Sequence, residues 1–367
     1  MSAPYRAARH NELVSPAATS ARRGAETWRS ATGAVLAVTS RDVAVRAGVS
    51  QATVSRVLND SPSVSPENRS KVLAALEATG YVLNAQARAM RTSRSGSIGI
   101  VTSEIQNPFL PYLLDELARS TGEMGLNAMV WNDDSPEARQ ASEGLASGVV
   151  DGVVFTAARS DSVGIRSLIL SGAPVVLCNR ASLDSAADVV MTDHEACGRM
   201  SAEYLLNHGR QNLAAIFGSR DTFASPLREA GFRAAMAAAG VALDRRLVRR
   251  GRTAYESGLA LTTQLVKSGA PIDAIFCSSD IIAYGAMDAL RLHGVRVPDD
   301  VWVIGIDGLP MSEWSAFDLT TFKQDVTRVA RGAVERIVAR VGGDQSPPSQ
   351  ELVPAALTVR GSTAQES

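Results

Sequence analysis

The stretch Gln51–Leu58 carries side chains that can contact the edges of DNA bases. Gln51 and Ser55 are four residues apart, as are Ala52 and Arg56, so on a helix both pairs lie on one face. A glutamine can hydrogen-bond to an adenine edge, an arginine can bind guanine, and an alanine methyl can contact the methyl group of thymine. The same spacing is also typical of the solvated face of an amphipathic helix. The residue pattern by itself leaves both interpretations open.

Three short helices are predicted to hold this face in place. A capping box at 39–42 begins the first helix, and Gly48 ends it. Ser50 caps the second helix, and Ser65 followed by proline begins the third, which ends at Gly80. The apolar residues that mark the helices are Val43, Ala44, Ala47, Val54, Val57, Leu58, Val72, Leu73 and Leu76. Three such helices, with a glycine turn between the first two, are typical of a helix-turn-helix domain.

Charge is divided unevenly along the chain. Its 37 Lys and Arg nearly balance 38 Asp and Glu, for a formal net charge of −1 over 367 residues. Residues 1–95 nevertheless carry a net charge of +7, so the remainder carries −8. A basic first quarter indicates a domain that binds a polyanion, although a solvated basic surface gives the same count.

Short apolar runs alternate with helical stretches from residue 98 onward, which predicts parallel sheets covered by helices. The expected strands are 98–101, 127–131, 152–155, 174–178, 213–217, 273–277 and 301–305. So many strands favour two doubly wound lobes over one sheet. Ligands of such sheets bind at the carboxyl ends of the strands, and a cleft between two lobes is a common site.

The segment Val38–Asn59 strongly resembles the DNA-binding head of LacI/GalR-family bacterial repressors. The resemblance covers about residues 38–361, and its further motifs are 64–65, 80–81, 84–90, 98–100, 107–109, 150–152, 229–232, 279–280, 305–307 and 320–324. It implies an all-α helix-turn-helix head with a hinge helix, followed by an α/β effector domain of two lobes like a periplasmic binding protein. It also implies a homodimer on a pseudo-palindromic operator in double-stranded DNA.

On this resemblance, the recognition helix enters the major groove and the hinge helix enters the minor groove. The implied DNA-binding residues are Gln51, Ala52, Thr53, Ser55, Arg56, Asn59, Arg88, Met90 and Arg91. Met90 takes the place of the leucine that such repressors wedge into a base step. Leu83 stands where the family commonly has a proline, which changes the rigidity of the hinge. Arg94 is a further candidate for a phosphate contact.

The resemblance also places an effector between the lobes. The implied effector-binding residues are Asn107, Phe109, Asn179, Arg180, Arg228, Thr253, Asp280 and Gln324. An arginine fork with an acceptor carboxylate suits a small sugar or polyol, and Arg180 could pair with the carboxylate of a sugar acid. Thr253 stands where several relatives have an aromatic platform, which disfavours a stacked purine. Three positions have structural alternatives: Asn107, which precedes a proline, and Asp193 as helix caps, and Asp307 as a hinge residue.

The expected domain organisation follows from these patterns. Residues 1–37 form a disordered extension, 38–83 the head, 84–95 the hinge helix and linker, and 96–367 the effector-binding and dimerisation domain. The first lobe is expected at about 97–194 and 324–341, and the second at about 195–322 and 342–361. Three cysteines at long spacings and no secretory signal favour a reducing, cytoplasmic location.

Two other classes of protein, an enzyme and a sugar-binding receptor, are less consistent with these residues. No nucleotide-binding, hydrolase or metalloprotease motif supports an enzyme or a cofactor. Asp193, His194, Glu195 and Cys197 could suggest a metal site, but neighbours at a helix start point in different directions. A soluble sugar-binding receptor would explain the lobes but not the helix-turn-helix. No apolar run reaches the roughly 18 residues that a membrane helix needs.

Overall fold

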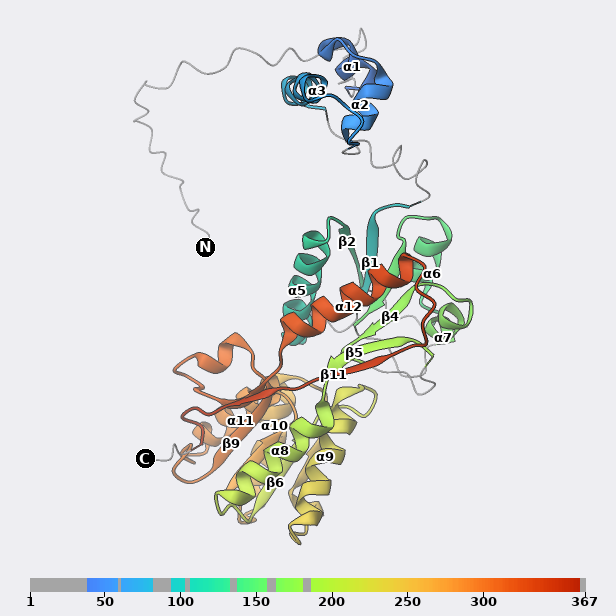
Figure 1. Ribbon diagram of the computed structural model, residues 1–367. Coiled ribbons are helices and arrows are strands. Elements are labelled where there is room, and N and C mark those ends of the chain that lie inside the picture. The colour runs from blue at the N-terminus through green and yellow to red at the C-terminus, as the bar shows by residue number, and fades with distance from the viewer. Residues whose placement is uncertain are drawn as a thin grey trace, which may run out of the picture. The chain divides into compact units, whose positions relative to one another are not determined.

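The computed structural model describes residues 38–58, 61–81, 94–102, 106–132, 137–156, 163–180 and 186–363 (Figure 1). The chain divides into two compact units, residues 1–84 and 85–367. The expected disordered extension at 1–37 lies outside the described residues, as do residues 84–93 of the expected hinge.

The first unit contains the three predicted helices α1 (Ser40–Ala47), α2 (Gln51–Leu58) and α3 (Pro66–Thr79). The capping box at 39–42 is present, Ser65 caps α3, and both glycine stops adopt the left-handed conformation that ends a helix. The core consists of Val43, Ala44, Ala47, Val54, Val57, Val72 and Ala75. Leu73 is 54% exposed instead, because Val72 and Ala75 form the inner face of α3.

The second unit begins with a six-stranded, fully parallel sheet, which forms lobe 1. Its strands, in spatial order, are β11 (Gln350–Val353), β5 (Asp188–Thr192), β4 (Val175–Cys178), β3 (Gly152–Phe155), β1 (Ser97–Thr102) and β2 (Asn127–Asn132). Its helices are α5 (Phe109–Glu123), α6 (Arg139–Ala146), α7 (Val163–Leu170) and α12 (Val326–Val341). Helix α12 packs on α5 and on β3, β4 and β5.

Lobe 2 repeats the same architecture with a second six-stranded sheet (Figure 1). Its strands, in spatial order, are β12 (Ala356–Thr358), β10 (Thr320–Lys323), β9 (Trp302–Asp307), β8 (Ala274–Cys277), β6 (Leu213–Phe217) and β7 (Val248–Arg250), and only β12 is antiparallel to its neighbour. Its helices are α8 (His194–Asn207), α9 (Ala224–Ala238), α10 (Tyr255–Lys267) and α11 (Asp280–Leu292), with short 3₁₀ turns η1 (Arg245–Leu247) and η2 (Pro310–Glu313). All seven strands expected from the sequence are present.

The chain passes between the lobes three times, after β5, after β10 and after β11. These three crossovers are 192–194, 323–326 and 353–356. The sequence assigned all of 342–361 to the second lobe, whereas β11 pairs in parallel with β5 and belongs to lobe 1. The short strands β5, β7, β10, β11 and β12 were not predicted. Their places depend on pairing partners far away in the chain.

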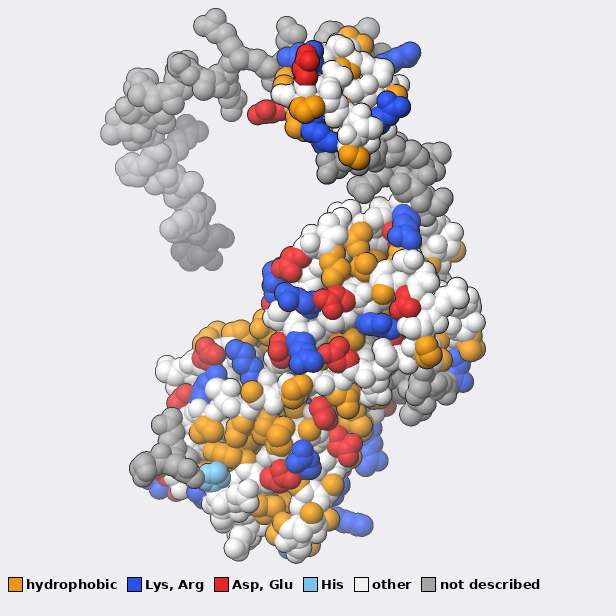
Figure 2. Space-filling view, viewed as in Figure 1, with side chains coloured by type: hydrophobic (Ala, Val, Ile, Leu, Met, Phe, Trp, Pro, Cys, Tyr) orange, Lys and Arg blue, Asp and Glu red, His pale blue; other side chains and the backbone are white. Residues whose placement is uncertain are grey.

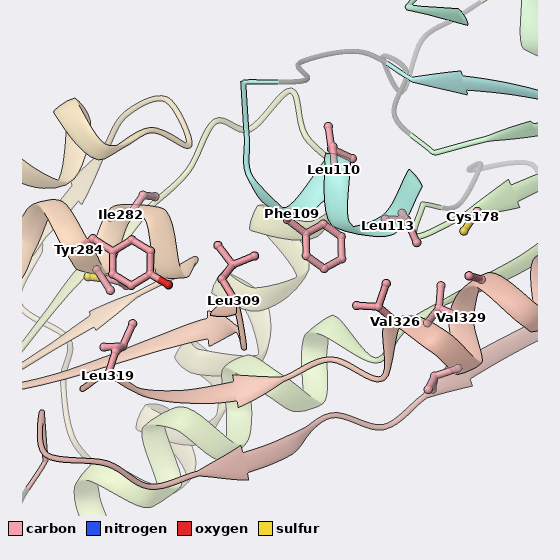
Figure 3. Close-up of a cluster of buried hydrophobic side chains, with 14 of the residues drawn as sticks. Phe109, Leu110, Leu113, Cys178, Ile282, Tyr284, Leu309, Leu319, Val326 and Val329 are labelled. Atoms are coloured by element: carbon pink, nitrogen blue, oxygen red, sulfur yellow. The ribbon is translucent and has the colours of Figure 1, made fainter. Parts of the chain in front are cut away.

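An apolar cluster joins the two lobes near the crossovers (Figure 3). Phe109 and Leu113 of α5 in lobe 1 belong to the same cluster of buried side chains as Ile282, Tyr284 and Leu309 of lobe 2. The lobes therefore share buried apolar surface in addition to their covalent connections. In the described part of the chain, no helix has the length and apolar character needed to cross a membrane.

Candidate nucleic-acid interface and effector site

Helix α2 presents outward the face that the sequence assigned to base contacts. Gln51, Ala52 and Arg56 are exposed, while Val54 and Val57 are buried against the other helices. Thr53 and Ser55 are half-buried on the same helix. The amide nitrogen of Gln51 donates to the hydroxyl of Ser40 at 2.8 Å, which orients the glutamine at the start of α2. The position of Gln51 is therefore set by α1.

The remaining predicted DNA contacts divide into two groups. Asn59, Arg88, Met90 and Arg91 lie outside the described residues, so their expected roles stay predictions. Arg94 is described, and its guanidinium donates to the carbonyl of Val341 at the end of α12, at 2.8 Å. The backbone amides of residues 95 and 96 both donate to the carboxylate of Asp151, at 2.6 and 2.8 Å. These bonds fix the start of lobe 1 where the chain enters it.

The lobe 1 residues lie where β1 and β4 end. The Asn107 side chain accepts the backbone N–H of Phe109, the first residue of α5, at 3.1 Å. Phe109 is buried in the apolar cluster between the lobes. Asn179 directly follows β4 with a φ of 56°, in the left-handed region that few residues other than glycine adopt. Arg180 is buried, and burial lowers its pKa to about 10, so it remains a cation at neutral pH.

Arg228 of α9 occupies a buried polar position in lobe 2 and is only 4% exposed. Its guanidinium donates to the carboxylate of Asp307 at 2.9 Å and to the carbonyl of Ser278 at 2.5 Å. Its Nε and Nη2 also approach Nδ1 of His194 at 3.4 and 3.3 Å. Burial, and then the charge of Arg228, hold the pKa of His194 well below its ordinary value. The imidazole is therefore neutral and Nδ1 accepts from the arginine.

Asp307 connects this arginine to the crossovers. Its Oδ1 accepts from Arg228 and, at 2.7 Å, from the side-chain amide of Gln324. The other end of Gln324 accepts the hydroxyl of Thr192 at 2.6 Å. Asp307 has a φ of 143°, a backbone conformation that is strained for a residue with a side chain. One buried chain of hydrogen bonds, here called the crossover chain, thus links five side chains: Thr192, Gln324, Asp307, Arg228 and His194.

Asp280 lies near the crossover chain but its carboxylate is bonded within lobe 2. It accepts the backbone N–H of Leu309 at 2.9 Å, the hydroxyl of Ser312 at 2.8 Å and the hydroxyl of Thr321 at 2.6 Å. The side chain is fully buried. Burial, then the nearby charge of Asp307, raise the pKa of Asp280 to about 6, against the lowering effect of these hydrogen bonds. Asp280 and Gln324 both have hydrogen-bond partners within the protein. Their direct contact with an effector stays a prediction.

The other expected effector residues lie apart from the crossover chain. Thr253 follows β7 and is half-buried, and a Cβ at Gly218 would collide with its hydroxyl. Among the described residues, no hydrogen bond joins Asn107, Asn179 or Thr253 to the crossover chain. The described residues contain no cluster of His, Cys, Asp and Glu suited to a metal ion. Asp193 instead caps α8 by accepting the backbone N–H of residue 196 at 2.9 Å, as one interpretation predicted.

Thr192, His194 and Ser278 were not among the predicted site residues. Thr192 ends β5, and His194 follows one residue after the capping aspartate. For Thr192 and His194, the available signal was a polar residue close to the boundary expected between the lobes, at 194. The bond from Thr192 to Gln324 joins positions 132 residues apart, which no local pattern specifies.

A helix-turn-helix head and two parallel-sheet lobes define the class of helix-turn-helix transcriptional regulators with a periplasmic-binding-protein-like domain. Residues 39–84 match the bacterial regulatory proteins of the lacI family, and residues 202–363 match the periplasmic binding protein-like domain. The chain is 32% identical to the transcriptional regulator DegA of Bacillus subtilis (strain 168), over 88% of its own length and 97% of that relative. The chain belongs to the LacI family of bacterial DNA-binding transcriptional regulators, as the sequence predicted.

Other relatives and solved structures agree with this assignment. The regulator AscG of Escherichia coli (strain K12) is 32% identical over 84% of this chain and 94% of its own. The lac repressor dimer bound to operator and the anti-inducer ONPF has a TM-score of 0.79 at 26% identity, and the CelR–cellobiose complex has 0.68 at 30%. Each structure covers 89% of this chain and 99% of its own. These relatives are regulators, not enzymes.

Proposed function

We propose that this chain is a cytoplasmic repressor that binds a pseudo-palindromic operator as a homodimer. The observation that carries the proposal is the exposed face of α2, where Gln51, Ala52 and Arg56 point away from the core of the head. Each of these side chains has a known way of contacting a base edge in the major groove. Two heads in a dimer would read two half-sites, which gives the operator its symmetry.

A small polar effector, a sugar, polyol or sugar acid, is proposed to bind between the lobes and change operator affinity. Ligands of doubly wound sheets bind at the carboxyl ends of the strands. Asn179 and Arg180 follow β4 and Thr253 follows β7, while Arg228 of α9 contacts residues at the ends of β8 and β9. Arg228 is the proposed principal contact, because a planar guanidinium can hold two acceptor oxygens at once. The CelR structure was solved with cellobiose, which supports a sugar as the class to test first.

The first experiment is selection of operator sequences from random DNA duplexes by the purified protein at about 0.15 M salt, where non-specific phosphate contacts are weak. The expected result is an enriched palindrome. The recovered site is then used to screen sugars, polyols and sugar acids for a change in affinity. Failure to enrich any sequence would contradict the operator-binding proposal. An enriched site whose affinity none of these compounds changes would contradict the effector class alone.

A sugar-binding receptor with no DNA function is the alternative from another class of protein. It would use the same lobes, and the same selection distinguishes it, because such a receptor enriches no sequence. The exposed recognition face of α2 favours the regulator.

A further inference from the structure

We infer that Gln324 couples the two lobes through its bonds to Thr192 and Asp307, so that it is a positioning residue for the effector response. The inference rests on the proposed function, because it assigns a mechanism to the site described above. Thr192 is the last residue of β5 in lobe 1, Gln324 lies in the second crossover, and Asp307 ends β9 in lobe 2. One side chain therefore bridges elements of both lobes.

Both ends of the Gln324 amide are used. Its carbonyl oxygen accepts the Thr192 hydroxyl at 2.6 Å, and its nitrogen donates to Asp307 at 2.7 Å. Gln324 is 3% exposed and Thr192 is fully buried, so water cannot readily replace either partner. A change in the angle between the lobes that moves the first crossover relative to the second would break the bond between Thr192 and Gln324. The pair of bonds consequently favours one orientation of the lobes over others.

The bridge leads directly to the proposed effector contact. The same Oδ1 atom of Asp307 accepts from both Gln324 and Arg228. Asp307 is held at a φ of 143°, which persists only where surrounding contacts enforce it. An acceptor group of an effector that engages Arg228 competes with Asp307 for the guanidinium. Loss of that partner changes the bonding of Asp307, and Gln324 transmits the change to Thr192 in lobe 1.

The decisive variant is Thr192→Val, which keeps the side-chain shape and removes the hydroxyl donor. Thr262→Val in α10 is its matched control. Thr262 is also fully buried, but its hydroxyl has no hydrogen-bond partner among the described residues. Gln324→Met is a second variant that removes both bonds at similar volume. Melting temperature and dimer mass are measured for every variant, so that misfolding is recognised separately.

Two readouts test the inference on the full-length protein. The first is hydrogen exchange of two backbone amides. The amide of residue 193, in the first crossover, donates to the carbonyl of Val353, and the amide of residue 324, in the second crossover, donates to the carbonyl of Asp307. Thr192→Val and Gln324→Met are expected to accelerate exchange at both, and Thr262→Val at neither. The second readout is affinity for the selected operator, expected to change about fivefold or more for Thr192→Val, the effect of losing one buried hydrogen bond.

Each outcome has a defined meaning. If Thr192→Val binds the operator more weakly, the lobe orientation that contains the Thr192–Gln324 bond is the one that binds DNA. If it binds more tightly, that orientation is the one that releases DNA. Either change supports the coupling role. Unchanged exchange in Thr192→Val overturns the bridge itself. Faster exchange with unchanged operator affinity shows that the bond is only structural and overturns the coupling. If the wild-type protein selects no operator, the proposed function fails first, whereas the exchange result still decides whether the bridge joins the crossovers.

Discussion

The buried carboxylate of Asp280 gives a prediction about how the stability of the protein depends on pH. Three donors surround it: the Leu309 amide and the hydroxyls of Ser312 and Thr321. In Asp280→Asn, the amide oxygen can keep the Leu309 and Ser312 bonds. The new NH₂ group can donate to Thr321, because the hydroxyl of Thr321 can rotate and become an acceptor. The variant therefore keeps the same three neighbours, reverses the direction of the Thr321 bond and removes the charge.

The magnitude follows from the raised pKa of Asp280. Its pKa is about 6, against an ordinary value of 3.8. At roughly 1.4 kcal/mol for each unit of pKa, ionisation is about 3 kcal/mol less favourable in the folded protein than in the unfolded chain. Because the folded-state pKa is the higher one, this contribution to stability is fully present below 3.8. It is lost as the pH rises through about 6.

The assay is urea-induced unfolding, followed by circular dichroism, of wild type and Asp280→Asn between about pH 4 and pH 8. The difference in free energy of unfolding is expected to move in favour of the variant by up to about 3 kcal/mol as pH rises across this range. Asp280→Ala, which leaves three buried donors without an acceptor, is expected to be destabilised at every pH. A difference between wild type and Asp280→Asn that stays constant with pH would refute the reasoning.

Four further predictions concern the other parts of the molecule. Arg56→Ala should weaken binding to the selected operator by about 1–3 kcal/mol while leaving non-specific DNA binding nearly unchanged. Arg46→Ala, which removes an arginine from α1 instead of α2, is the control, and an equal loss on all DNA in Arg56→Ala would contradict base readout. Arg228→Met combined with Asp307→Asn, which avoids an unpaired buried carboxylate, should abolish the change in operator affinity that the effector causes; a surviving response would show that the effector contact lies elsewhere. Burial alone would raise the pKa of Asp188, but hydrogen bonds from Arg340, the Ser349 amide and Arg336 lower it to about 2. Asp188→Asn should therefore cost about 2 kcal/mol at neutral pH, a contribution present above pH 3.8 and lost as the pH falls through about 2, and an unchanged unfolding midpoint at pH 7 would contradict it. Thr39→Ala removes the capping box of α1 and should lower the stability of the head by about 1 kcal/mol, measured as faster hydrogen exchange of the α1 amides.

The head was predictable from its sequence because its determinants are local. Thr39 and Asp42 form a capping box three residues apart, and Gly48 directly follows the last residue of the same eight-residue helix. The inward positions of Val54 and Val57 follow from helical periodicity. Leu73 shows the limit of this reasoning. Neighbouring apolar residues on α3 compete for one contact surface, and only packing against α1 and α2 decides which of them is buried.

The site between the lobes was predictable only in part. Arg228, Asp280 and Gln324 were identified as functional candidates, and the structure shows all three to be buried and hydrogen-bonded. Their partners were not predicted. Gln324 meets Thr192 across 132 residues, and Arg228 meets Asp307 across 79. The first contact depends on how the crossovers are placed, and the second on how α9 packs against the end of β9 within lobe 2.

The sequence by itself determined the helix-turn-helix, the alternation of strands and helices, and membership of the LacI family, because caps, periodicity and family motifs are properties of short segments. The tertiary structure decided that β11 joins lobe 1 and that Asp280 faces three protein donors. It also linked Gln324 to groups in both lobes. The physical reason is that burial and hydrogen bonding depend on neighbours in space. Those neighbours become adjacent only when the chain has folded into its two lobes.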